Sequence, residues 1–200
     1  MVGNCILVCP KGQNSGVLGV LRNKSIKYSI VPNFFMGFIR AKKIGGKEYA
    51  YLVSNRWYKR RHKGKNKGPR QKVSRYLGRV HSFNKTENID FFSFIKIGSL
   101  EQYLKDNRNN KSRIFKDLVE WELFRHNIDK THFTIDYSNR KIINKNNNKE
   151  VSLRMNEGFL NSFTLNRIFN INSNDSYYLA RCFIEAGIEV PKEVFVGVFG

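Results

Sequence analysis

Apolar and polar side chains alternate along residues 37–80 in the way that β-strands require, because successive side chains of a strand point to opposite faces. Residues 37–44 alternate imperfectly, and the glycines at positions 45 and 46 then accept the positive φ angles of a tight hairpin turn. Tyrosine, leucine and valine recur along residues 47–60, and the pattern resumes from Arg70 to about Gly78. We therefore predict a small antiparallel sheet of three strands.

The segment between the second and third of these strands has no apolar residue. Residues 62–69, HKGKNKGP, contain two glycines and a proline, which mark loops and not packed elements. We predict that this segment is the flexible tip of the longest hairpin and becomes ordered only on a ligand.

The apolar residues change to helical spacing after Ser99. Ile114, Leu118 and Trp121, for example, recur at intervals of four and three and are expected to face a core. Gly187 is expected to end the last helix. The spacing predicts helices at residues 100–107, 112–127, 156–171 and 173–188, strands at residues 133–137, 141–144 and 151–155, and an extended or loosely turned segment at residues 190–200.

Together these elements predict an α+β fold in two parts. A basic antiparallel β module spans residues 36–82, and an α+β domain spans residues 95–200. Strong patterning begins only after Met36, so residues 1–35 are either a genuine extension, such as a further hairpin, or upstream sequence read as coding. An apolar content of 40% in 200 residues is enough to build a core.

The charge of the chain is large and unevenly distributed. The formal net charge is +20, but residues 1–89 hold 20 Lys and Arg and 2 Asp and Glu, which gives +18. Residues 90–200 hold 16 Lys and Arg and 14 Asp and Glu, which gives +2. Such asymmetry points to a polyanionic partner. Nucleic acid is the first candidate, and an anionic membrane surface is the second.

Most of this excess lies in one run between Arg56 and Arg79, which contains eleven cations and no acid. Trp57, Tyr58 and Tyr76 stand among the cations, where aromatic rings can stack on bases while guanidinium groups pair with phosphates. The alternative is a solvated loop beside aromatic residues of the core. The residues that we predict to contact nucleic acid are Arg56, Trp57, Tyr58, Lys59, Arg60, Arg61, Lys63, Lys65, Lys67, Arg70, Lys72, Arg75 and Arg79.

The acidic and histidine residues give no positive indication of catalysis. Glu120 and Glu122 are two apart and point to different sides of a predicted helix, so they cannot share a metal ion. Asp117, Glu120 and Arg125 are expected to form ion pairs at the surface. No phosphate-binding glycine loop is present. We predict no catalytic residue and no cofactor, although a site assembled from distant residues stays open.

The cysteines favour a reducing compartment. Cys5, Cys9 and Cys182 are an odd and sparse set, which is unlike a disulfide framework. Cys5 and Cys9 lack a second Cys or His pair at close spacing, so we predict buried thiols and no metal site. No apolar stretch approaches the roughly 18 residues of a membrane span, and no signal peptide is evident. We therefore expect a cytoplasmic protein.

Two segments carry a family resemblance. FIRAKKIGGKEYAYLVSNRW, at residues 38–57, and GPRQKVSRYLGRV, at residues 68–80, resemble the N-terminal module of insertion-sequence transposases of the DDE type. The same start, together with the ending LARCFIEAGIEVPKEVFVGVF, is similar to small basic archaeal proteins. The matching positions are Ile39, Arg40, Lys42, Gly46, Lys47, Tyr49, Tyr51, Leu52, Val53, Arg70, Gln71, Lys72, Val73, Tyr76, Leu77 and Gly78.

The remainder of the chain departs from that family. In transposases such a start precedes a large catalytic domain with three spaced acidic residues, and the residues after position 80 are too few for that domain. The resemblance therefore implies a nucleic-acid-binding module without the recombinase. Three hypotheses follow: a non-enzymatic binder of DNA or RNA, a nuclease or transposase-derived remnant with a C-terminal active site, and a factor that docks on a ribonucleoprotein.

Overall fold

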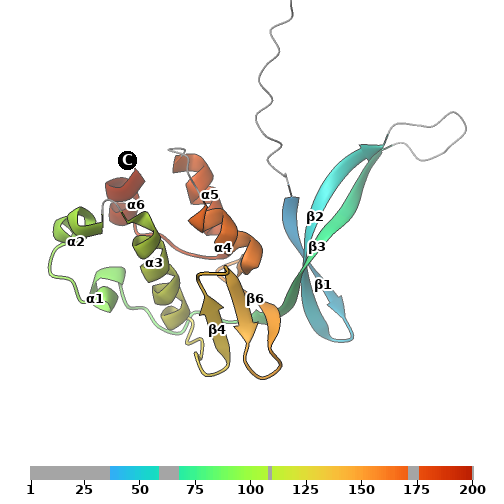
Figure 1. Ribbon diagram of the computed structural model, residues 1–200, viewed down its shortest axis with the longest axis horizontal. Helices are drawn as coiled ribbons and strands as arrows, with labels where there is room; N and C mark the ends of the chain where they lie inside the picture. Colours follow the sequence, from blue (N-terminus) through green and yellow to red (C-terminus); the bar gives the residue numbers. More distant parts are fainter. Residues whose placement is uncertain (1–36, 59–67, 108–109, 171–175, 200) are drawn as a thin grey trace, which may run out of the picture. The chain divides into compact units, whose positions relative to one another are not determined.

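The structure is a computed structural model, and it describes residues 37–58, 68–107, 110–170 and 176–199 (Figure 1). The predicted extension at residues 1–35, the predicted tip and the cysteines at positions 5 and 9 lie outside the described residues, apart from the last two tip residues, Gly68 and Pro69. Within the described residues the fold is α+β, as the hydrophobic pattern predicts.

The first part of the chain forms the three predicted strands. β1 (Gly37–Ile44) and β2 (Lys47–Tyr58) pair antiparallel, and β3 (Gly68–Ser82) pairs antiparallel with β2. Gly45 and Gly46 have φ angles of 57° and 76°, so the turn between β1 and β2 uses the left-handed backbone that glycine adopts without strain.

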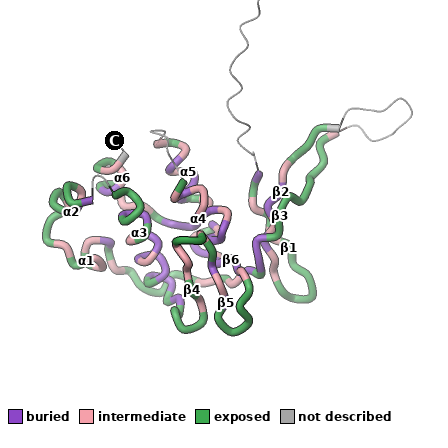
Figure 2. The backbone as a smooth tube through the Cα atoms, viewed as in Figure 1, coloured by how far each residue is buried: buried purple, intermediate pink, exposed green. Residues whose placement is uncertain are grey.

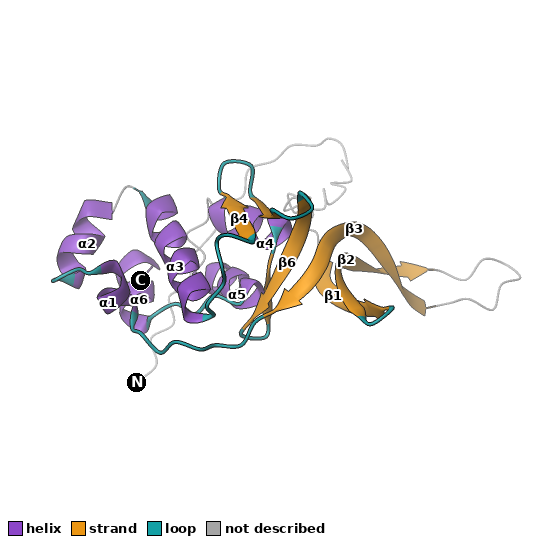
Figure 3. Cartoon of the chain, turned by 90° about the horizontal axis from the view of Figure 1, so that it is seen from below, coloured by secondary structure: helices purple, strands orange, loops and turns teal. Residues whose placement is uncertain are grey.

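β3 does not end near Gly78 but continues to Ser82. Residues Arg79–Ser82 pair parallel with residues Val151–Arg154 of β6 (Lys149–Met155), and Figure 3 shows the two strands running side by side. Gly78 permits this parallel pairing, because its φ is 103° and a Cβ at this position would lie 2.5 Å from the Glu150 carbonyl oxygen. The glycine is therefore a point of close backbone approach within the strand, and the prediction that the strand ends there is wrong.

The strands form one sheet in the order β1-β2-β3-β6-β5-β4. β4 (Phe133–Asp136) and β5 (Lys141–Asn144) continue the sheet beyond β6, and β7 (Gly158–Leu160) pairs with the end of β6. The predicted module and the predicted second domain therefore share one sheet, and residues 35–200 form one compact unit. Their division into two functional parts stays a prediction.

Six helices lie among the described residues, and several correspond to predicted ones. They are α1 (Phe91–Ile95), α2 (Leu100–Asn107), α3 (Lys111–Arg125), α4 (Ser162–Phe169), α5 (Ser176–Ala186) and α6 (Lys192–Phe199). Asn127 and Gly187 follow α3 and α5 with φ angles of 47° and 74°, the left-handed backbone that ends helices.

Two predictions for the second half are wrong. Residues 156–160 are not helical, because Asn156 and Glu157 form a turn with φ angles of 43° and 63° that leads into β7. Asn161 then caps α4 through a reciprocal pair of hydrogen bonds with Thr164, and helix begins only there. The extended or loosely turned segment predicted near the C-terminus is instead α6, which begins directly after Pro191, a residue suited to the start of a helix.

Two apolar clusters of different size stabilise the sheet (Figure 2). The larger one joins α3, α4 and α5 to β5, β6 and β7 and contains fully buried residues such as Leu118, Leu153 and Phe183. The smaller one lies at the base of the hairpin and consists of Ala50, Leu52, Leu77 and Val80, with Ile39, Phe159 and Phe163 packed against it. Because Phe159 and Phe163 belong to the second half, the base of the hairpin is anchored to the rest of the fold.

Candidate nucleic-acid interface

The distal part of the β2–β3 hairpin brings predicted cations together on one face. Arg56 lies directly opposite Arg70, and Ser54 lies opposite Lys72 two positions closer to the base. Arg56, Arg70 and Lys72 are all exposed. Because residues two apart in a strand and residues opposite each other in a ladder share a face, Arg56, Arg70 and Lys72 form one cluster, which we call the distal cation cluster.

Two β-bulges in β3 determine which side chains face the core. The register shifts between Ala50 and Tyr51 and again between Leu52 and Val53, so that Leu77 and Ser74 are the extra residues in β3. The first bulge places Leu77, which is 1% exposed, in the apolar cluster at the base. Each bulge resets the alternation, so a strict period of two does not predict the faces of β3.

Arg75 belongs to the base of the hairpin and not to the distal cluster. Its guanidinium lies 3.9 Å from the Glu150 carboxylate and donates to Ser162 Oγ over 3.4 Å. The side chain is about half exposed. Of the cations predicted to bind phosphate, Arg75 therefore already has an acidic partner within the fold.

The opposite face of the hairpin carries three tyrosines that sequence reasoning did not assign to the site as a group. The ring centroids of Tyr51 and Tyr76 are 5.5 Å apart, and those of Tyr49 and Tyr76 are 6.3 Å apart. Burial, followed by the neighbouring hydroxyls of Tyr51 and Tyr49, raises the pKa of the Tyr76 phenol above its ordinary value. The hydroxyl therefore stays protonated and can donate a hydrogen bond at neutral pH.

Cations surround these rings. Lys42 Nζ lies 5.6 Å from the centroid of the Tyr51 ring, Arg79 is opposite Tyr49 in the ladder, and the Arg40 guanidinium donates to Gln71 Oε1 across the sheet. The sequence does contain a signal for this face. Arg40 and Lys42 are two apart in one predicted strand, and Tyr49 and Tyr51 are two apart in the next. The hairpin register places these two pairs opposite each other.

The other residues that were predicted to bind nucleic acid lie on β2, on β3 or outside the described residues. Trp57 is 64% exposed and opposite Pro69, on the face of the tyrosines and not on that of the distal cation cluster. Tyr58 ends β2, and Arg79 is exposed. The others, which are Lys59, Arg60, Arg61, Lys63, Lys65 and Lys67, lie outside the described residues.

The second half contains a buried charged cluster that the sequence did not predict. Arg125 was expected at the surface, but its side chain is 4% exposed and lies 3.0 Å from Glu122 and 2.7 Å from Glu189. Glu122 also accepts from the Asn156 amide, and His126 Nδ1 lies 3.3 Å from its carboxylate. Burial raises the pKa of Glu122 to about 7, although a guanidinium is close. Helical periodicity put Arg125 on the surface because it ignores the turn and the loop that pack over the end of α3.

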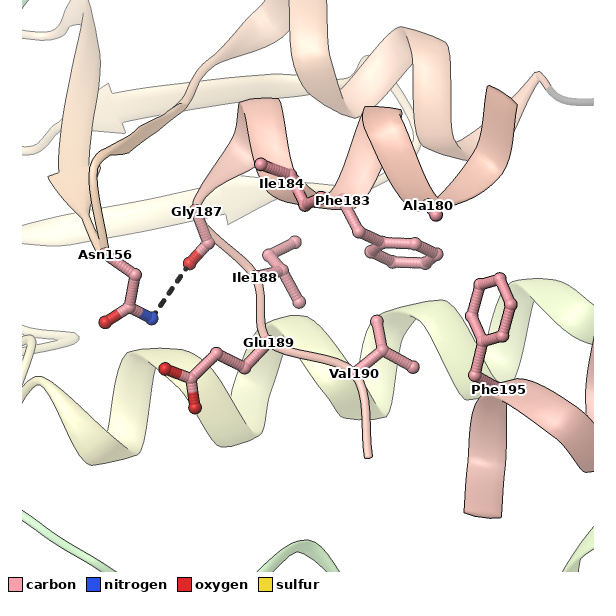
Figure 4. A pocket seen from close by; sticks show the side chains of 9 residues that line it. All are labelled: Asn156, Ala180, Phe183, Ile184, Gly187, Ile188, Glu189, Val190 and Phe195. Carbon is pink, nitrogen blue, oxygen red and sulfur yellow. Dashed lines mark hydrogen bonds between the residues drawn. The ribbon is translucent and has the colours of Figure 1, made fainter. Parts of the chain in front are cut away.

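A mostly apolar cavity of about 560 Å³ lies beside this cluster (Figure 4). Phe183, Ile188 and Phe195 line it, and Asn156 donates to the Gly187 carbonyl oxygen at its edge over 3.2 Å. Glu189 is the one carboxylate among its lining residues. The cavity can hold an apolar group, and its polar groups are already engaged in the buried cluster.

The described part of the chain has no group of three or more His, Cys, Asp or Glu residues that could hold a metal ion. None of its helices is both long enough and apolar enough to cross a membrane. Cys182 is a buried free thiol, and burial raises its pKa.

Comparison of the chain with protein-family models, with curated proteins and with solved structures found no match.

Proposed function

We propose that this protein binds nucleic acid through phosphate contacts made by the β2–β3 hairpin, without catalysing a reaction. The observation that carries the proposal is the register of the hairpin, which places Arg56 directly opposite Arg70, with Lys72 on the same face. A phosphate backbone lying along this face of the ladder would meet these cations at successive positions.

The chemistry of these side chains favours phosphate over other anions. A guanidinium presents a planar fork of donors that matches two phosphate oxygens, and a lysine adds a flexible point charge. Arg56 and Arg70 supply two such forks at one level of the ribbon, and Lys72 lies two residues closer to the base. A polymer of phosphates can occupy all three positions at once, which a single small anion cannot do.

The anchoring of the hairpin also supports the proposal. Its base is packed against Phe159 and Phe163 and tied to the second half by Arg75 with Glu150 and by Arg154 with Glu48. The distal cation cluster is thus held on a pair of strands with a stable root. The residues that resemble the transposase module lie on β1, β2 and β3 and in the turn between β1 and β2, which is consistent with a binding element that works without a catalytic domain.

The test is a charge-removal variant in the full chain. The triple variant Arg56→Ala, Arg70→Ala and Lys72→Ala should bind labelled DNA and RNA about tenfold to a hundredfold more weakly, since an exposed ion pair contributes about 0.5 to 1 kcal/mol. The matched control replaces three exposed lysines of the second half, Lys105, Lys145 and Lys192, by alanine and loses the same charge. Equal losses in both variants would contradict the assignment to the hairpin.

The non-enzymatic part of the proposal has its own test. Labelled single strands and duplexes of DNA and RNA, incubated with the wild-type protein and Mg²⁺ or Mn²⁺, should be recovered intact. Metal-dependent cleavage products would instead favour a nuclease or a transposase-derived remnant.

A further inference from the structure

Three tyrosines of the hairpin form an aromatic surface, which we call the tyrosine face. It consists of Tyr49, Tyr51 and Tyr76, with Arg40, Lys42 and Arg79 around them. Tyr76 is 52% exposed although it contacts both other rings. The opposite face of the same strands buries Ala50, Leu52 and Leu77. The rings are therefore not needed to fill the apolar cluster at the base of the hairpin.

We infer that the tyrosine face binds unpaired nucleotides, whose bases stack on the tyrosine rings while Arg40, Lys42 and Arg79 hold the adjoining phosphates. The inference rests on the proposed function and adds to it the state of the nucleic acid. It concerns the shared chemistry of an unpaired base, which DNA and RNA both offer, and the two are compared in the experiment below.

The geometry favours unpaired bases over a duplex. An aromatic side chain on a sheet can stack on a base only where the face of that base is free, and in a duplex the faces are occupied by the neighbouring base pairs. The rings lie 5.5 and 6.3 Å apart and are tilted by 52° and 41°, so they do not stack face to face on one another, and Tyr76 is 52% exposed to a ligand. Lys42 Nζ lies over the Tyr51 ring. Positive charge is therefore available beside the rings for the phosphate that adjoins a stacked base.

The tyrosine face and the distal cation cluster are on opposite faces of the sheet. A two-stranded ribbon twists strongly, so one nucleic-acid strand can reach both only by crossing the ribbon. The two sites should therefore respond separately to substitution. Loss of the tyrosine face should weaken binding of single strands, and loss of the distal cation cluster should weaken binding of every nucleic acid.

The experiment compares Tyr76→Leu with Tyr76→Phe in the full chain, using labelled single-stranded DNA, single-stranded RNA and the matching duplexes. Tyr76→Leu should weaken binding of single strands about tenfold and of duplexes less than about twofold, the range expected when one stacking ring is removed. Tyr76→Phe keeps the ring and should stay within about twofold of wild type for all four ligands. Tyr177→Leu is the matched control, because Tyr177 is 78% exposed on α5, outside the hairpin.

Three results would overturn the inference. Equal losses for single strands and duplexes would show that the face does not distinguish unpaired bases. Equal losses in Tyr76→Phe and Tyr76→Leu would show that the hydroxyl, and not the ring, makes the contact. An effect of Tyr177→Leu as large as that of Tyr76→Leu would show a general effect of losing an exposed tyrosine.

A measurement on the wild-type protein covers the case in which Tyr76→Leu does not fold. Single strands that carry iodouracil crosslink on irradiation to aromatic side chains stacked on the base, and the crosslinked peptide should contain Tyr51 or Tyr76. Crosslinks confined to other residues would overturn the inference. If Tyr76→Leu changes nothing while the distal triple variant weakens all ligands, the proposed function stands and this inference fails. If the wild type binds no nucleic acid, both fail.

Discussion

Charged side chains have different neighbours in the hairpin and in the second half of the chain. In the second half several cations lie beside acids: Lys130 is 2.6 Å from Glu120, and Arg167 and Arg181 both contact Glu185. In the distal hairpin the ladder instead places one arginine opposite another. The formal charge follows the same division, with +18 in residues 1–89 and +2 in residues 90–200.

The two regions therefore differ in arrangement: acids and cations are paired in the second half, whereas two arginines face each other across the ladder of the hairpin. An ion pair on the surface contributes little to stability, but it leaves no net demand for a partner. A run of like charges raises the free energy of the folded state through mutual repulsion, and a polyanion removes that cost. Under the proposed function, the hairpin binds the nucleic acid and the second half supports the hairpin.

The largest expected effect is on stability and lies at the connection between the two regions, where β3 approaches β6. Gly78→Ala should lower the free energy of unfolding by about 2 to 5 kcal/mol, because a side chain there is strained at φ 103° and collides with the backbone of β6. Urea denaturation of the full chain measures this loss. Gly98→Ala is the control, since a Cβ at Gly98 meets no atom within 4 Å.

A loss of less than about 1 kcal/mol in Gly78→Ala would contradict the close approach of β3 to β6. The hairpin would then be anchored more loosely than its packing against Phe159 and Phe163 implies.

The buried charged cluster of the second half should make the free energy of unfolding depend on pH. The carboxyl of Glu122 has a pKa of about 7 in the folded protein and an ordinary value of 4.5. The folded state therefore binds this proton more tightly than the unfolded state, and the stabilisation is complete below pH 4.5 and lost as pH rises through 7. The free energy of unfolding should fall over this window by up to about 3 kcal/mol.

Glu122→Gln should remove most of that pH dependence, measured as urea denaturation at a series of pH values. Glu101→Gln, at an exposed carboxyl of α2, should leave it unchanged. Nucleic-acid binding by Glu122→Gln should match wild type wherever the variant is folded. An unchanged pH profile in Glu122→Gln would place the titrating group elsewhere.

The smallest expected effect concerns Arg75, which stands between the two regions. Because its guanidinium lies beside Glu150 and Ser162, Arg75→Ala should weaken binding less than about threefold and change stability by less than about 1 kcal/mol. Anisotropy measurements of Arg75→Ala and Arg70→Ala against one ligand provide the test. A larger loss of affinity in Arg75→Ala than in Arg70→Ala would extend the binding surface to the base of the hairpin.

The strands and turns that could be predicted from sequence are those set by local pattern. Alternating residues and two glycines defined β1, β2 and their turn, and helical spacing found α2, α3 and α5. The parallel pairing of β3 with β6 could not be predicted, because it joins segments some seventy residues apart and depends on close backbone contact at Gly78. α6 was missed because its valines and phenylalanines favour strands, and packing overrides that preference.

The candidate site could be predicted only in part from the sequence, for a similar reason. Composition alone identifies a cationic run, and Arg56, Arg70 and Lys72 do share a face. The tyrosine face needs the register of three strands and the positions of two bulges, which fold-level contacts determine. Arg75 and Arg125 show the converse, since their type predicts surface charge while their neighbours Glu150 and Glu122 give them partners within the fold.

The salt dependence of duplex binding tests the division of charge most directly. The logarithm of the association constant, plotted against the logarithm of salt concentration, should fall with a slope of about −5 or steeper for the wild type, as six or more phosphate contacts require. In the variant lacking Arg56, Arg70 and Lys72 the slope should become shallower by up to about 2.7, while the variant lacking Lys105, Lys145 and Lys192 should keep the wild-type slope. A flat wild-type line, or the same change of slope in both variants, would contradict the account.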